Sequence, residues 1–257
     1  MRIMSQEFKI HQLFLTNNNC YKTGRKQKVK GIMWHSTGAN NPKLSRYVGP
    51  DDGILGPNKY NNHWNQPKPD GRNVCVHAFI GKDKNGKVRT YQTLPWDHVG
   101  WHSGYGSKGS ANTMGYIGFE ICEDGLQDKK YFDEVYKEAI ELSVFLCKKY
   151  NLTEKNIIDH AEGHRMGIAS NHGDVRHWFS RFGKSMDDVR RDVARRLKEG
   201  DVMSKLQNWQ KVQGEKALDS LNKKKDNFGN PVVNSPEEWK KKLGENIPGW
   251  LFWSIID

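Results

Sequence analysis

The stretch GYIGFEICE, residues 115–123, predicts the centre of the fold. It is a short apolar run bounded by turn residues, which is typical of a central strand in a sheet. Glu120 interrupts the run between Phe119 and Ile121, whose side chains alternate to the opposite face. A carboxylate on a central strand is costly unless it is paired or faces a site. We therefore expect Glu120 to face a functional site.

Segments on either side of this stretch predict the rest of a sheet and its covering helices. A hairpin is indicated by Asn85-Gly86 between two strand-like runs. A regular apolar stripe predicts an amphipathic helix, and Ser185 with Asp188 resembles the cap of another helix. This mixed order predicts an α/β fold with a mixed central β-sheet flanked by helices. The predicted strands are 29–34, 74–81, 88–92, 115–123 and 156–162, and the predicted helices begin at 132 and near 186.

The character of the chain changes after Gly200. No histidine occurs beyond His177, yet four of the nine tryptophans lie in the last 57 residues. We predict a large domain over 1–200, which is long enough to form a catalytic domain, and a small helical C-terminal domain over 201–257. The small domain has helical patterns at roughly 203–225 and 235–257. Its tryptophans either build a small core or bind a partner, such as cell wall or a second copy of the chain.

Charge and cysteine content limit the class of protein. The net charge is +11, of which the first 200 residues carry +10. A basic surface suits a polyanionic partner, but no nucleic-acid-binding motif is present, so nucleic acid stays a weak alternative. The four cysteines are widely spaced without a CxxC motif, which favours free thiols in a reducing compartment.

No apolar run is long enough to cross a bilayer, which argues against membrane insertion. The N-terminal stretch MRIMSQEFKIHQLFL lacks the apolar region and cleavage site of a signal peptide. We therefore expect synthesis in the cytoplasm, with any action outside the cell following release by another route.

The stretch HAEGHRMGIASNHGDVRH, residues 160–177, holds four of the ten histidines. HAEGH differs from the zinc-peptidase motif HExxH because its glutamate is displaced by one position. Gly163 and the strand-like residues before it also argue against a helix here. A zinc site is better built from separate segments, with His35 and His160 at strand ends and Asp174 on a loop. His164 remains a rival to His160.

Five motifs in order resemble the zinc-dependent N-acetylmuramoyl-L-alanine amidases of the amidase type 2 family, which includes phage lysozyme-amidases and animal peptidoglycan-recognition proteins. The resemblance covers about residues 25 to 197. Together with the length and tail, it resembles an endolysin from a phage or prophage of Gram-positive bacteria. The motifs are MWHSTG (33–38), VHAFIGKDKNGKVRTYQ (76–92), GWHSG (100–104), YIGFEICEDG (116–125) and HAE followed by HGDV (160–175).

The resemblance implies a role for each candidate residue. His35, His160 and Asp174 match the zinc ligands, and Glu120 matches the general base. His172 stands where many relatives have a lysine that stabilises the oxyanion, and a histidine can still donate a hydrogen bond there. Four more residues are expected to border the substrate groove: Trp101, His102, His63 and Trp64.

The implied activity is hydrolysis of the amide between N-acetylmuramic acid and L-alanine in bacterial peptidoglycan, with zinc as cofactor. A non-catalytic peptidoglycan-binding module of the same fold is the main alternative. A pure binder need not keep the three ligands and Glu120, so their presence favours the enzyme.

Overall fold

The computed structural model describes residues 8–225, 229–231 and 235–237, with only the backbone described for 200–211. Its strands form one six-stranded mixed sheet in the order β1-β4-β3-β5-β2-β6. All neighbouring pairs are parallel except β3 with β4, which forms the predicted hairpin. The predicted mixed sheet is therefore confirmed. The strands are β1 Ile10–Gln12, β2 Gly31–Asn40, β3 Ala78–Lys82, β4 Val88–Gln92, β5 Tyr116–Glu123 and β6 Ile157–Asp159.

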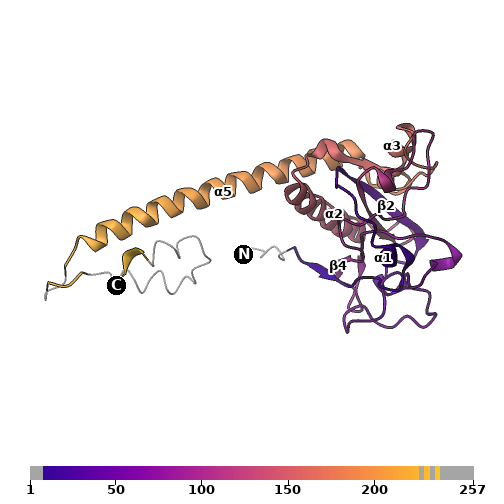
Figure 1. The fold of residues 1–257 in the computed structure, drawn as a ribbon, viewed down its shortest axis with the longest axis horizontal. Coiled ribbons are helices and arrows are strands. Elements are labelled where there is room, and N and C mark those ends of the chain that lie inside the picture. The colour runs from indigo at the N-terminus through magenta and orange to yellow at the C-terminus, as the bar shows by residue number, and fades with distance from the viewer. Residues whose placement is uncertain (1–7, 226–228, 232–234, 238–257) are drawn as a thin grey trace. The chain divides into compact units, whose positions relative to one another are not determined.

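Helix α2 covers one face of this sheet (Figure 1). It begins after Asp128, whose side chain accepts the backbone N–H of Tyr131, and it ends at Asn151 in the left-handed conformation. On β2, Trp34 donates from Nε1 to Ser143 Oγ of α2 at 3.1 Å. Because side chains alternate along a strand, His35 faces away from α2. The helices are α1 Asn19–Thr23, α2 Lys129–Tyr150, α3 His160–Arg165, α4 Arg176–Phe179 and α5 Met186–Asn222.

The expectation that HAEGH is not helical was wrong, because His160–Arg165 form the short helix α3. Asp159 accepts the backbone N–H of Glu162 at 2.6 Å, and the Glu162 carboxylate accepts that of Asp159 at 3.2 Å. This capping box starts a helix that propensity alone disfavours. Gly163 is required by packing, since a Cβ there would lie 2.7 Å from Met33 Cε. The predicted strand accordingly ends at residue 159 rather than 162.

Two compact units are found, Met1–Arg196 and Leu197–Asp257. The predicted cap before the last described helix is present, since the Ser185 hydroxyl donates to Asp188 at 2.6 Å. Helix α5 continues without interruption from Met186 to Asn222, so no secondary-structure element ends at the predicted boundary near 200. The second predicted helix of the tail, 235–257, lies almost entirely outside the described residues.

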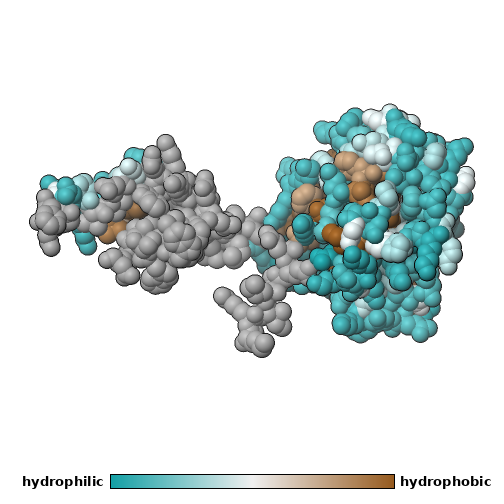
Figure 2. Space-filling view, turned by 90° about the horizontal axis from the view of Figure 1, so that it is seen from below, coloured by the Kyte–Doolittle hydropathy of each residue, from teal (hydrophilic) through white to brown (hydrophobic). Residues whose placement is uncertain are grey.

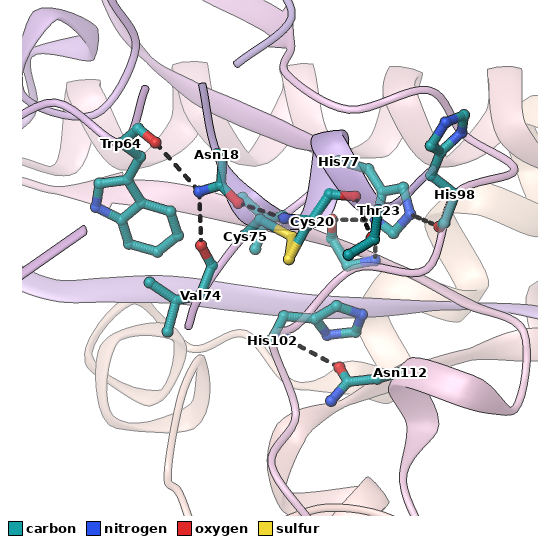
Figure 3. The surroundings of a disulfide bond; sticks show 12 residues. Asn18, Cys20, Thr23, Trp64, Val74, Cys75, His77, His98, His102 and Asn112 are labelled. Atoms are coloured by element: carbon teal, nitrogen blue, oxygen red, sulfur yellow. Dashed lines mark hydrogen bonds between the residues drawn. A yellow bond between two sulfur atoms is a disulfide. The ribbon is translucent and has the colours of Figure 1, made fainter. Parts of the chain in front are cut away.

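The expectation of four free thiols was wrong for two of the cysteines. Cys20 and Cys75 form a disulfide with a Cα–Cα distance of 6.4 Å (Figure 3). They are 55 residues apart in sequence, so only the tertiary fold brings them together. Asn18, just before Cys20, holds this junction by donating to the carbonyls of Trp64 and Val74. The other two cysteines, Cys122 and Cys147, are buried and free.

Hydrophilic residues dominate the face of the larger unit drawn in Figure 2, where hydrophobic residues gather in a confined patch. Within the described part of the chain, no helix is both long and apolar enough to cross a membrane.

Candidate metal centre and its cleft

Three neighbouring strands, β5, β2 and β6, bring the predicted chemical groups together, although β2 continues to Asn40 beyond the end predicted at His35. His35 on β2 is the register partner of Glu120 on β5, so both side chains lie on the same face of the sheet. Trp34 pairs with Asp159 on β6, which places His160 directly beyond that strand. Carboxyl ends of parallel strands meet at one edge, and ligands bind there in open α/β sheets.

His35, His160 and Asp174 form a compact cluster at this edge. The Nδ1 atom of His35 lies 3.0 Å from Asp174 Oδ2 and 3.2 Å from His160 Nδ1. One ligand atom from each residue lies within 4.8 Å of the other two. Two imidazole nitrogens and a carboxylate oxygen are a ligand set typical of catalytic zinc, which leaves a fourth position for water or substrate. The residues present therefore fit a zinc ion.

The protonation of the cluster also suits a cation. Burial alone would raise the pKa of Asp174, but its hydrogen bond to His35 and the charges of His35 and His160 lower it to about 2. Burial, with the nearby His35, lowers the pKa of His160 to about 4. Near neutral pH the aspartate is therefore ionised and His160 is neutral, which are the forms that bind metals.

His102 holds the far side of the His35 ring. Its Nδ1 lies 2.9 Å from His35 Nε2, and its Nε2 lies 3.3 Å from the carbonyl oxygen of Tyr116. If His35 offers Nδ1 to a metal, its proton sits on Nε2 and is donated to His102, which in turn donates to Tyr116. Burial keeps the pKa of His102 well below its usual value, so the ring is neutral and can accept this bond.

The same loop also supports His160. His160 Nε2 lies 3.3 Å from Ser170 Oγ, which donates to the carbonyl of Ser103 at 3.2 Å. The buried Asn112 accepts the backbone N–H of His102 (Figure 3) and that of Ser103. Residues 102–103 therefore hold the Nε2 atoms of both histidines of the cluster. His102 contacts His35 directly, and Ser103 reaches His160 through the hydroxyl of Ser170. This support depends on tertiary contacts, and the sequence carried no signal for it beyond the GWHSG motif.

Glu120 is the second carboxylate of the site. Its Oε2 is buried without a hydrogen-bond partner among the described residues. Burial, followed by the charges of Asp174 and Glu123, raises the pKa of Glu120 well above its usual value. A carboxylate with a raised pKa is a better base near neutral pH than an ordinary surface carboxylate.

A cavity of about 670 Å³ lies over these groups. Trp64, Trp101 and His102 line it, as does His172, whose ring stacks on His160 with centroids 4.9 Å apart. The His172 side chain is 63% exposed, and its Nδ1 lies 3.9 Å from Asp174 Oδ1.

Two residues that the sequence offered as candidates for the site lie away from this cavity. His63 is not among its lining residues and instead lies against Gly49. His164, the rival second ligand, is exposed, and its Nδ1 lies 3.2 Å from the Ala169 carbonyl. His160, not His164, therefore lies beside His35.

The sequence did not single out several residues of the cavity wall. His177 lines the cavity, and its Nε2 lies 2.9 Å from Glu123 Oε1. Arg72 brings an exposed cation to the wall, and Tyr47 and Ser170 also line it. The sequence offers one signal for Arg72 and Tyr47, which is the length of the segment between residues 39 and 72, rich in Asn, Pro, Gly and Asp.

Comparison with known proteins supplies a family for this arrangement. The model of the N-acetylmuramoyl-L-alanine amidase family (Amidase_2) matches residues 25–177, which include every group of the cluster. The N-acetylmuramoyl-L-alanine amidase CwlH of Bacillus subtilis is 37% identical over 70 residues, which are 27% of this chain and 26% of that relative.

Two solved structures are similar to this one. The hydrolase AmiA of Staphylococcus aureus, solved with its ligand, aligns with a TM-score of 0.52 at 18% identity, covering 76% of this chain and 87% of that one. A mutant endolysin from Bacillus subtilis aligns with a TM-score of 0.47 at 22% identity, covering 72% and 98% respectively. At these identities the first alignment supports the sheet architecture alone.

Proposed function

Because the chain belongs to the N-acetylmuramoyl-L-alanine amidase family, we propose that it hydrolyses the amide between N-acetylmuramic acid and the stem peptide of bacterial peptidoglycan. The bond joins the lactyl carbonyl of the sugar to the amine of L-alanine. The observation that carries the proposal is the convergence of His35, His160 and Asp174 beside Glu120 in one cavity.

His35 and His160, each through Nδ1, and Asp174 through its carboxylate are the residues that would hold zinc. Zinc bound by such a set supplies Lewis acidity toward a carbonyl and a water of lowered pKa. His102 and Ser170 fix the ring orientation of the two histidines. Outer partners of this kind commonly set the tautomer of a ligating histidine.

Glu120 acts as the general base. It removes a proton from the attacking water as the water oxygen bonds to the lactyl carbonyl carbon. It then delivers the proton to the alanine nitrogen as the carbon–nitrogen bond breaks. The products are a free lactyl carboxylate and a peptide with a new L-alanine N-terminus. His172, exposed at the cavity mouth, donates a hydrogen bond to the oxyanion that forms between these steps.

The cell wall is the place where such an enzyme acts. The disulfide between Cys20 and Cys75 fits action outside the cell, because disulfides persist in oxidising environments. The basic charge of the first 200 residues favours association with an anionic wall. We assign the chain an endolysin-type role, in which it reaches the wall of Gram-positive bacteria after release from the cytoplasm.

The test is turnover of purified peptidoglycan before and after removal of zinc with a chelator. We expect new alanine N-termini to appear, to stop with the chelator and to return with added zinc. Binding to peptidoglycan without any release, with zinc present, would instead indicate the non-catalytic binder.

A further inference from the structure

A second cavity adjoins the one over the metal cluster. Its volume is about 540 Å³, and Trp101 lines both cavities, so the two meet at this residue. Much of its lining comes from the N-terminal segment around α1, with Asn19, Cys20 and Lys22, and from Arg25 just beyond it. Neither the family motifs nor the proposed reaction uses these residues.

The wall of this second cavity is held in place covalently and by hydrogen bonds. Cys20 is joined to Cys75, and the backbone of Cys75 exchanges both of its hydrogen bonds with Trp101, at 3.1 and 3.0 Å. Asn18 ties the start of α1 to the same junction through the Trp64 and Val74 carbonyls (Figure 3). The α1 side and the Trp101 side of the cavity therefore keep a fixed separation.

The charge of the second cavity has one sign. Lys22 and Arg25 are its two charged lining residues, and no acidic residue lines it. Both are exposed, and neither forms an ion pair within the described part of the chain. Their neighbour Lys26 differs, because its amine contacts Asp97 at 2.8 Å. Two unpaired cations beside a fixed apolar wall are suited to a carboxylate, which a guanidinium binds through paired hydrogen bonds.

We propose that the second cavity is a subsite for a carboxylate of the stem peptide, which passes over Trp101 from the reacting bond. The inference rests on the proposed function. The amino-sugar chain is uncharged where its lactyl groups are amidated, whereas the peptide beyond alanine carries carboxylates. Lys22 and Arg25 therefore select the peptide side of the substrate. Asn19 and Asn73 offer amide groups to its backbone, and Trp101 offers an apolar surface to its aliphatic parts.

The test compares two soluble muramoyl peptides that differ only in whether the peptide carboxylates are free or amidated. In the double variant Lys22→Ala, Arg25→Ala, we expect KM for the carboxylate substrate to rise about 10-fold or more, since hydrogen bonds to charged groups contribute at about this level. KM for the amidated substrate should change less than about twofold, with kcat unchanged for both. The matched control is Lys28→Ala, Lys30→Ala, which removes the same charge from exposed residues outside both cavities.

An equal rise in KM for both substrates, an equal rise in the control, or no rise at all would overturn the subsite. Direct titration of the same two peptides onto Glu120→Gln protein separates this result from the fate of the proposed reaction. If the wild-type chain cleaves nothing, the proposed function fails, but a carboxylate preference in binding that disappears in the double variant still supports the subsite. Equal binding of both peptides contradicts it.

Discussion

Replacement of His102 tests whether the loop at residues 102–103 holds the metal ligands. In His102→Leu, the acceptor 2.9 Å from His35 Nε2 is removed, so a buried N–H loses its partner and the His35 ring loses its fixed orientation. Loss of such an outer partner typically weakens metal binding by about 10- to 100-fold, equivalent to about 1.4–2.7 kcal/mol. We expect a reduction of that size in zinc affinity.

The assay is competition for zinc with a chromophoric chelator near neutral pH, alongside thermal unfolding of the metal-free protein. His102→Asn is the matched variant, because its amide oxygen can accept the bond from His35. We expect it to recover most of the affinity, whereas a general packing defect would lower the metal-free Tm of both variants alike. A zinc affinity of His102→Leu equal to that of the wild type would refute the role of His102 in holding the His35 ring.

Three further predictions concern the base, the buried histidine behind the site and the disulfide. Glu120→Gln should lower kcat about 10²- to 10⁴-fold while the zinc content stays at the wild-type level; full activity would remove Glu120 from its role. Burial lowers the pKa of His77 from 6.5 to about 4. The free energy of unfolding is therefore unaffected by His77 above about pH 6.5 and falls by about 3 kcal/mol as the pH is lowered to 4, because only the unfolded chain takes up the proton in this range. Urea unfolding across this range should show a steeper fall for wild type than for His77→Gln. Cys20→Ser should lower the free energy of unfolding by about 2–4 kcal/mol, because the disulfide closes a long loop; equal stability of the reduced and oxidised wild type would contradict this.

The sheet and the metal cluster could be predicted because their signals are local or carried by ordered motifs. Glu120 interrupts an apolar strand, His35 lies on the neighbouring strand and His160 directly follows a third, so alternation and strand order place them together. The Cys20–Cys75 pairing could not be predicted, because the two cysteines are 55 residues apart in sequence and meet only through the packing of α1. Helix α3 was missed because the capping pair Asp159–Glu162 outweighs the weak propensity of Gly163.

For the residues expected at the substrate groove, the sequence predicts a position at the cavity but not what each side chain contacts. Trp101 was expected at the cavity and lines it. His102 was expected to contact substrate, yet both of its ring nitrogens contact protein atoms, His35 Nε2 and the Tyr116 carbonyl. Nothing in the sequence distinguishes a histidine that contacts substrate from one that contacts a metal-binding residue such as His35. The difference depends only on how the loop that carries His102 folds back onto β2.

In the proposed reaction, water is the nucleophile that breaks the lactyl–alanine amide. Mass spectrometry of a defined muramoyl peptide, incubated with the zinc-loaded protein in ¹⁸O-labelled water, tests it most directly. We expect a peptide with a free L-alanine N-terminus and a muramic acid whose lactyl carboxylate carries the label. Label in the peptide, a cleaved glycosidic bond or an intact substrate would contradict it.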